Sequence, residues 1–166
     1  MELNKIISRW LLTMIYLIVV IIVVGGVTRL TNSGLSIPSW EIIEIFPPMT
    51  EGKWGEKFNN YKAYPDYKNQ NKKEGKITID EYSKIYWWEY IHRSIGRIIG
   101  LLAIIPFFYF IYKKYLSKKQ KIAYSTILLL IIFQGLVGWL MVNSGLNPDI
   151  YKIGRGVSPF WLLGHL

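Results

Sequence analysis

The chain has 166 residues, 51% of them hydrophobic, with apolar segments long enough to cross a bilayer, which excludes an ordinary soluble domain. The net charge of +9 does not indicate nucleic-acid binding, because many lysines lie in short flanks of apolar segments, where membrane topology explains them. Cysteine is absent, which excludes disulfides and thiolate sites, and any histidine chemistry must use the two histidines, His92 and His165.

The first apolar segment predicts a membrane-spanning helix over residues 10–27, preceded by Lys5 and Arg9. A cleaved signal peptide is the alternative, but its apolar core usually has about 7–15 residues and ends at small residues. This segment is longer and continues into Gly25–Arg29. An uncleaved spanning helix is therefore favoured.

A long polar loop over residues 29–85 follows the first span. Loops longer than about 12–15 residues are usually functional or disordered. Trp54, Phe58 and Tyr61 recur at helical spacing within residues 50–62. This pattern predicts a short amphipathic helix that lies on the membrane or on the bundle.

The end of this loop leads into the second span, predicted over residues 86–112. Residues 69–75 are predicted to form a solvated linker. Thr78 and Glu81 then have the spacing of a capping box, which predicts a helix that continues without interruption into the span. An interfacial aromatic belt is predicted from Tyr86, Trp87, Trp88 and Tyr90.

Two more apolar segments predict a third span over residues 122–142 and a fourth over 158–166. The loop before the third span, residues 113–121, is dense in lysine. Ser158 and Pro159 have the composition of an N-cap and a first-turn proline. The sequence stops about two turns into this helix, so we expect a truncated chain.

The predicted fold class is an all-α integral membrane protein, a four-helix transmembrane bundle with a truncated fourth helix and a long outer loop containing short helices. The whole chain forms a single membrane domain. Lys5, Arg9 and the lysines of 113–121 place the N-terminus in the cytoplasm. The 29–85 loop and the 143–157 connector then lie outside, which in a bacterium is the periplasmic face.

Ionisable side chains and glycines gather at the start of the second span. Helical spacing places Glu89, His92, Gly96 and Gly100 on one stripe. The bare backbone below the histidine leaves room for a large flat group, although the glycines can equally serve close helix packing. Because ionisable groups at a membrane boundary are costly, this stripe indicates a functional site.

His92 and His165 are predicted at matching depth, roughly 6–10 Å beneath the outer interface, given a helical rise of about 1.5 Å per residue. Two such histidines can hold one metal centre in a bundle core. Histidine–iron–histidine ligation of a haem fits better than zinc, because no third or fourth protein ligand is available. The alternative for each histidine is an interfacial residue hydrogen-bonded to a carbonyl.

Glu89 is one turn above His92 and is a candidate general acid–base or stabiliser of positive charge. From spacing alone, pairing with Arg93 or a loop lysine is favoured. Arg29, Arg93 and Arg97 are candidates for haem propionates, because arginine binds carboxylates in a bidentate fork. Contact with lipid phosphates is slightly favoured for any one of the three.

The third span carries polar and small residues that are unusual in an apolar helix. Gln134 is predicted to donate an interhelical hydrogen bond rather than to act as a catalyst. Gly135 and Gly138 either allow close packing or leave space for a macrocycle, and the two interpretations are compatible.

Five motifs occur in order along nearly the whole chain: Gly25–Ser36, Phe46–Pro48, Glu89–Arg97, Gln134–Trp139 and Val157–Leu166. They resemble the corresponding segments of haem A synthases, in the proteobacterial and mitochondrial branch. The absence of cysteine suits this branch, because another branch carries a cysteine pair in its outer loops.

The resemblance implies an oxidoreductase that oxidises the C8 methyl of haem O to a formyl group, through an alcohol and a hydrated aldehyde, making haem A for cytochrome oxidase. Such enzymes have two similar four-helix halves, each with a histidine pair. This chain resembles the N-terminal half, which holds the substrate haem, whereas the other half holds a haem b cofactor. His92 and His165 match the iron ligands, and Glu89 matches the acidic residue implicated in the reaction.

The resemblance also implies a multi-pass protein of the bacterial inner membrane. Its partners would be haem O, membrane lipids, haem O synthase and cytochrome oxidase assembly factors, with no nucleic acid. Because the second half and most of the fourth helix are missing, the chain alone is expected to be an incomplete enzyme.

Two other functions remain open from the residues. A bis-histidine b-type electron-transfer cytochrome would need His92 and His165 but has no use for Glu89 or the capped loop helix. A membrane assembly protein without haem would need neither histidine.

Overall fold

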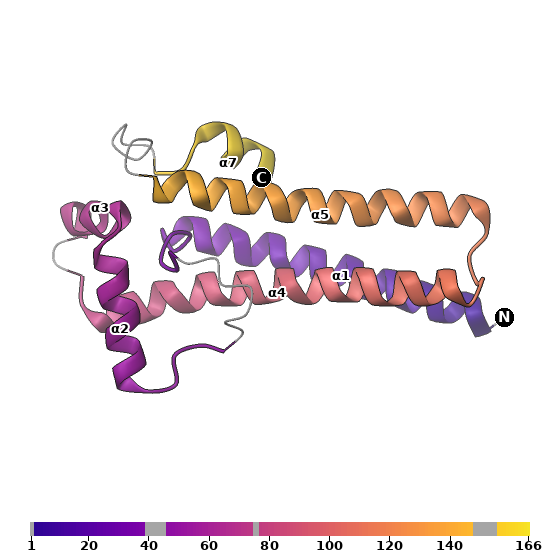
Figure 1. Cartoon of the computed structure of the whole chain (residues 1–166), viewed down its shortest axis with the longest axis horizontal. Helices are drawn as coiled ribbons and strands as arrows, with labels where there is room; N and C mark the ends of the chain where they lie inside the picture. Colours follow the sequence, from indigo (N-terminus) through magenta and orange to yellow (C-terminus); the bar gives the residue numbers. More distant parts are fainter. Residues whose placement is uncertain (1, 39–45, 75–76, 148–155) are drawn as a thin grey trace.

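The computed structural model describes residues 2–38, 46–74, 77–147 and 156–166, and in these ranges the secondary structure is entirely helical (Figure 1). Its elements are α1 (Glu2–Leu30), α2 (Glu51–Lys62), α3 (Pro65–Glu74), α4 (Ile79–Tyr112), α5 (Lys118–Leu146) and α7 (Pro159–His165). Three of them, α1, α4 and α5, are long and apolar enough to cross a membrane. The predicted all-α membrane fold is confirmed.

The helices form two packed pairs, because α1 lies along α4 and α7 lies along α5 (Figure 1). α5 touches α4 as well, but in the described residues it makes no close backbone contact with α1. α2 and α3 gather at one end of the long helices, whereas the N-terminus and the turn between α4 and α5 lie at the other (Figure 1). This arrangement is the alternation that the lysine distribution predicts.

Local sequence signals begin the helices as predicted. The Thr50 hydroxyl caps α2 by accepting from the backbone N–H of Lys53 at 3.4 Å. α4 begins with the predicted capping box, in which Glu81 accepts from the Thr78 N–H at 2.7 Å, and it continues unbroken to Tyr112. All three spans are longer than predicted because polar turns extend the apolar cores.

The start of α7 agrees with the prediction only in part. Pro159 is its first residue, but the Ser158 side chain makes no capping hydrogen bond. The Ser158 N–H instead donates to the Ser144 hydroxyl of α5 at 2.9 Å. Next to this bond, Gly145 packs so closely that an added Cβ would lie 2.8 Å from both Leu35 and Val157. α7 is therefore docked on α5 by tertiary contacts. The remainder of the predicted 143–157 connector lies mostly outside the described residues.

The predicted solvated linker over residues 69–75 is wrong, because residues up to Glu74 belong to α3. Buried Asp66 accepts a hydrogen bond from the Tyr61 hydroxyl at 2.8 Å. Buried Gln70 donates to the carbonyl of Asn32 at 3.0 Å. These tertiary contacts override the weak helix propensity of a polar segment.

The amphipathic helix α2 docks on the outer end of α4 through aromatic side chains. Phe58 and Tyr61 are buried, and Tyr61 stacks on Tyr82 with ring centroids 4.9 Å apart. Tyr86, predicted in the interfacial belt, is instead only 3% exposed because Trp54 covers it edge-on at 5.1 Å. α2 thus lies on the bundle, the second of the two predicted placements.

An indole hydrogen bond repairs a break in the α4 ladder near the opposite end. Pro106 lies inside α4 and has no N–H, which leaves the carbonyl of Leu102 without its helical donor. The Trp10 indole of α1 donates to this carbonyl at 2.7 Å. Edge-on contacts with Phe110 and Tyr124 hold the ring in place. The bond matters because lipid offers no replacement donor.

We expect Trp10→Phe to lower the free energy of unfolding in detergent by about 1–3 kcal/mol, the cost of an unpaired buried carbonyl. In a Pro106→Ala background the new N–H can pair with Leu102, so the same change should cost less. Reversible denaturation of the four proteins measures this difference. Equal costs in both backgrounds would contradict the repair.

Candidate functional site

The structure brings the only two histidines together. His92 lies on α4 and His165 at the end of α7, with ring centroids 6.2 Å apart and ring planes at 77°. The two rings are therefore neighbours, which is compatible with the predicted match in depth. Two imidazoles that share one metal ion have centroids roughly 6 Å apart, given metal–nitrogen bonds of about 2.0–2.1 Å.

One imidazole nitrogen has no protein partner. His165 Nδ1 is buried and neither accepts nor donates a hydrogen bond. An orphaned buried polar atom is costly, and in native proteins such an atom often binds an ion or a water molecule. The predicted hydrogen bond from Gln134 is confirmed, because its side-chain nitrogen donates to the His165 carbonyl at 3.4 Å. Gln134 thus fixes the backbone of His165 and leaves its ring available.

The donor set fits a haem iron better than a metal held by protein alone. Within the described ranges, no three His, Cys, Asp or Glu side chains come together. A tetrahedral zinc site would need a third or fourth protein ligand, whereas a haem iron needs two axial imidazoles. His92 and His165 satisfy the second requirement.

Glycine backbone lies beside both rings, from Gly138 on the predicted third span and from Gly25 on the first span, where it was not predicted. A Cβ added at Gly25 of α1 would lie 3.2 Å from His92 Nε2, and one added at Gly138 of α5 would lie 2.7 Å from His165 Cε1. Gly96 instead faces Ile21 of α1 at 3.6 Å, which fits helix packing. A Cβ at Gly100 or Gly135 would meet nothing within 4 Å.

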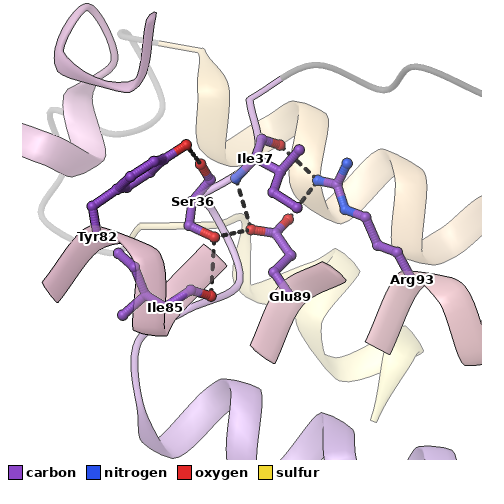
Figure 2. A network of polar contacts seen from close by, with 6 residues as sticks. All are labelled: Ser36, Ile37, Tyr82, Ile85, Glu89 and Arg93. Carbon is purple, nitrogen blue, oxygen red and sulfur yellow. Dashed lines mark hydrogen bonds and ion pairs between the residues drawn. The ribbon is translucent and has the colours of Figure 1, made fainter. Parts of the chain in front are cut away.

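Glu89 is buried and holds the segment that follows α1 (Figure 2). One carboxylate oxygen, Oε2, accepts from the Ile37 N–H at 2.8 Å and lies 2.7 Å from the Ser36 hydroxyl. The Ser36 oxygen is also 3.2 Å from the carbonyl of Ile85, and its own carbonyl accepts from the Tyr82 hydroxyl at 3.2 Å. This segment is therefore fixed to α4 at several points.

Arg93 completes the network from the next turn of α4 (Figure 2). Its guanidinium forms an ion pair with the second oxygen of Glu89 and donates to the carbonyl of Ile37 at 2.7 Å. The pairing of Glu89 with Arg93 that spacing favours is confirmed. Together the two side chains satisfy both polar backbone groups of Ile37, which a buried irregular segment requires.

The other two arginines lie elsewhere. Arg29 is exposed in the last turn of α1, and Arg97 is partly buried one turn beyond Arg93 on α4. Sequence reasoning missed Ser36 and Ile37 as partners of Glu89. The sequence signal for these partners was the polar segment that follows the first span. In the structure Ser36 of this segment is fully buried.

The fold and this site define a multi-pass helical membrane protein with a histidine pair between its helices. Residues 8–166 match the family model described as Cytochrome oxidase assembly protein. The chain belongs to this family.

Curated relatives agree with this assignment. The chain is 47% identical over 153 residues to a haem A synthase of Flavobacterium psychrophilum, covering 90% of this chain and 45% of the relative. It is 44% identical over 164 residues to one of Orientia tsutsugamushi strain Boryong, covering 98% and 44%. The Nitrosospira multiformis enzyme is 42% identical over 166 residues, covering 98% and 44%. The chain thus spans less than half the length of these relatives. No solved structure matches it.

We predict that Glu89→Ala loosens the segment that follows α1, here called the outer segment, because it removes the ion pair with Arg93 and the acceptor for the Ile37 N–H. Breaking a buried ion pair by removing one partner costs about 3–5 kcal/mol. Limited proteolysis in detergent should therefore cut residues 33–74 faster, with Glu89→Gln intermediate because its amide keeps one acceptor oxygen. The exposed Glu56→Ala is the matched control, and a cleavage rate equal to that of the control would contradict the anchoring role.

Proposed function

We propose that this chain is the substrate-haem half of a haem A synthase, an oxidoreductase that oxidises the C8 methyl of haem O to a formyl group and supplies haem A for cytochrome oxidase. The named relatives and the family match support this activity. The observation that carries it is the histidine pair, with ring centroids 6.2 Å apart and one ring nitrogen without a partner.

In this proposal His92 and His165 would hold the iron of haem O. When bound, the haem supplies the redox chemistry at its iron. The long helices supply an apolar surround that excludes water. Arg29 and Arg97 remain candidates for the propionates, together with Gly96 and Gly100 for the macrocycle. Arg93 is less well suited, because it already binds Glu89 and Ile37.

Glu89 keeps its predicted catalytic role as a hypothesis. It lies one turn above His92, so its charge is close enough to favour positive charge that develops on the substrate. Proton transfer, however, would require the carboxylate to release Ser36, Ile37 or Arg93. The contacts support anchoring more directly than acid–base chemistry.

The setting follows the same proposal. We place the protein in a bacterial inner membrane with its N-terminus in the cytoplasm and residues 29–85 in the periplasm. A second four-helix half would hold haem b, which the greater length of the relatives supports. Haem O synthase and cytochrome oxidase assembly factors are the proposed partners.

Replacing either histidine tests the iron ligands. The full-length gene should be expressed in a strain that lacks haem A synthase but makes haem O, and the extracted haems separated by chromatography. His92→Ala and His165→Ala should abolish haem A and leave haem O. Leu163→Ala is the matched control on α7, because this side chain is exposed, and it should leave haem A unchanged. Undiminished haem A in a histidine variant would overturn the ligand assignment.

The same strain separates the two roles of Glu89. If the carboxylate transfers protons, Glu89→Gln should lose haem A while the outer segment stays resistant to protease. If it anchors, haem A in Glu89→Gln and Glu89→Ala should fall in proportion to protease sensitivity. A protein whose bis-histidine haem is reduced and oxidised normally, but which makes no haem A, would favour an electron-transfer cytochrome. Such a cytochrome also has no need of a catalytic carboxylate.

A further inference from the structure

We infer that Gly25 and Gly138 are positioning residues that keep the nitrogen-bearing edges of His92 and His165 clear for iron. The inference rests on the proposed function, in which both imidazoles ligate a haem. Each glycine belongs to the helix packed beside its histidine, α1 beside α4 and α5 beside α7. Each histidine therefore has a glycine beside it on the neighbouring helix.

The space beside each ring is too small for a methyl group. A Cβ at Gly138 would lie 2.7 Å from Cε1 of His165, 3.2 Å from Nδ1 and 3.3 Å from Nε2. At Gly25 it would lie 3.2 Å from Nε2 and 3.4 Å from Cδ2 of His92. Because carbon atoms attract best at about 3.5–4.0 Å, both contacts are repulsive, and the one at Gly138 is the more severe. In both cases the crowded edge contains a nitrogen that could bind iron.

Helix packing does not explain these glycines as well. Close approach of two helix backbones is the usual reason for small residues in a span. At Gly25, however, the atoms within 4 Å of the missing Cβ belong to the His92 imidazole, and at Gly138 the three nearest atoms all belong to the His165 imidazole. Glycine also weakens a helix relative to alanine, so its presence here requires another reason.

Neighbouring glycines provide matched controls on the same helices. A Cβ at Gly26 or at Gly135 would meet nothing within 4 Å. Both glycines are exposed, so we do not retain Gly135 as space for the macrocycle. Gly26→Ala and Gly135→Ala therefore change the same residue type on the same two helices without touching either histidine. Any effect of helix propensity or of membrane insertion should be shared by all four variants.

The test uses purified full-length protein, with extracted haem quantified as haem O and haem b and the low-spin signal recorded by electron paramagnetic resonance. Loss of a residue that orients metal ligands typically costs about 10–100-fold in affinity. We expect Gly138→Ala to lose haem O by about tenfold or more and Gly25→Ala to lose less, with shifted low-spin signals in any retained haem. Gly26→Ala and Gly135→Ala should match the wild type, and haem b should be unchanged in all four.

Thermal unfolding of the same variants, prepared from cells that make no haem O, separates positioning from packing, because bound haem O would itself raise the melting temperature. All four variants should melt at or above the wild-type temperature, because alanine favours helix. Haem O binding by Gly138→Ala equal to that of Gly135→Ala would overturn the inference, as would lowered melting temperatures in both Gly25→Ala and Gly138→Ala. If haem O stays bound at the wild-type level in His92→Ala and His165→Ala, the proposed function itself fails.

Discussion

A buried carboxylate–guanidinium pair fixes the outer end of this bundle. Glu89 is only 2% exposed and Arg93 lies on the next turn, so the pair would be costly if its remaining polar atoms were unsatisfied. The segment after α1 provides that satisfaction, because Ile37 gives its N–H to Glu89 and its carbonyl to Arg93. Conversely, a chain that leaves a membrane helix irregularly needs partners for its own backbone. The buried ion pair and the irregular segment therefore satisfy each other's polar atoms.

The consequences of this anchor reach the second histidine. Leu35 lies directly before the anchored residues and packs with Val157 against Gly145 of α5. Beside it the Ser158 N–H is held by Ser144, and α7 begins there and carries His165 back along α5. A continuous series of contacts therefore links Glu89, one turn above the first histidine, to the element that presents the second. α1 and α5 make no close backbone contact in the described residues, so this outer segment is one of the links that set the distance between the two packed pairs.

Most of the architecture could be predicted because it depends on local signals. Apolar length defined the spans, and hydroxyl–carboxylate spacing located the start of α4. The linker over 69–75 was predicted wrongly because α3 is stabilised by contacts outside its own segment, with Tyr61 of α2 and with Asn32, which is distant in sequence. His92 and His165 were expected near each other from their positions along the spans, and their rings are neighbours. Gly138 was named from the sequence but Gly25 was not placed beside His92, because helix–helix register decides which backbone faces each ring.

The anchor also changes how a loss of activity at Glu89 should be understood. A carboxylate one turn from a proposed iron ligand invites a catalytic interpretation, since charge and proximity favour it. Yet the same carboxylate fixes Ser36 and Ile37, which adjoin Leu35 and the packing around α7. We therefore expect its removal to alter the position of His165 relative to His92, and the proposed iron ligation would depend on that separation to within fractions of an ångström. Catalysis and anchoring thus make the same prediction for alanine. They differ only when the charge is removed while the hydrogen-bonded shape of the side chain is kept.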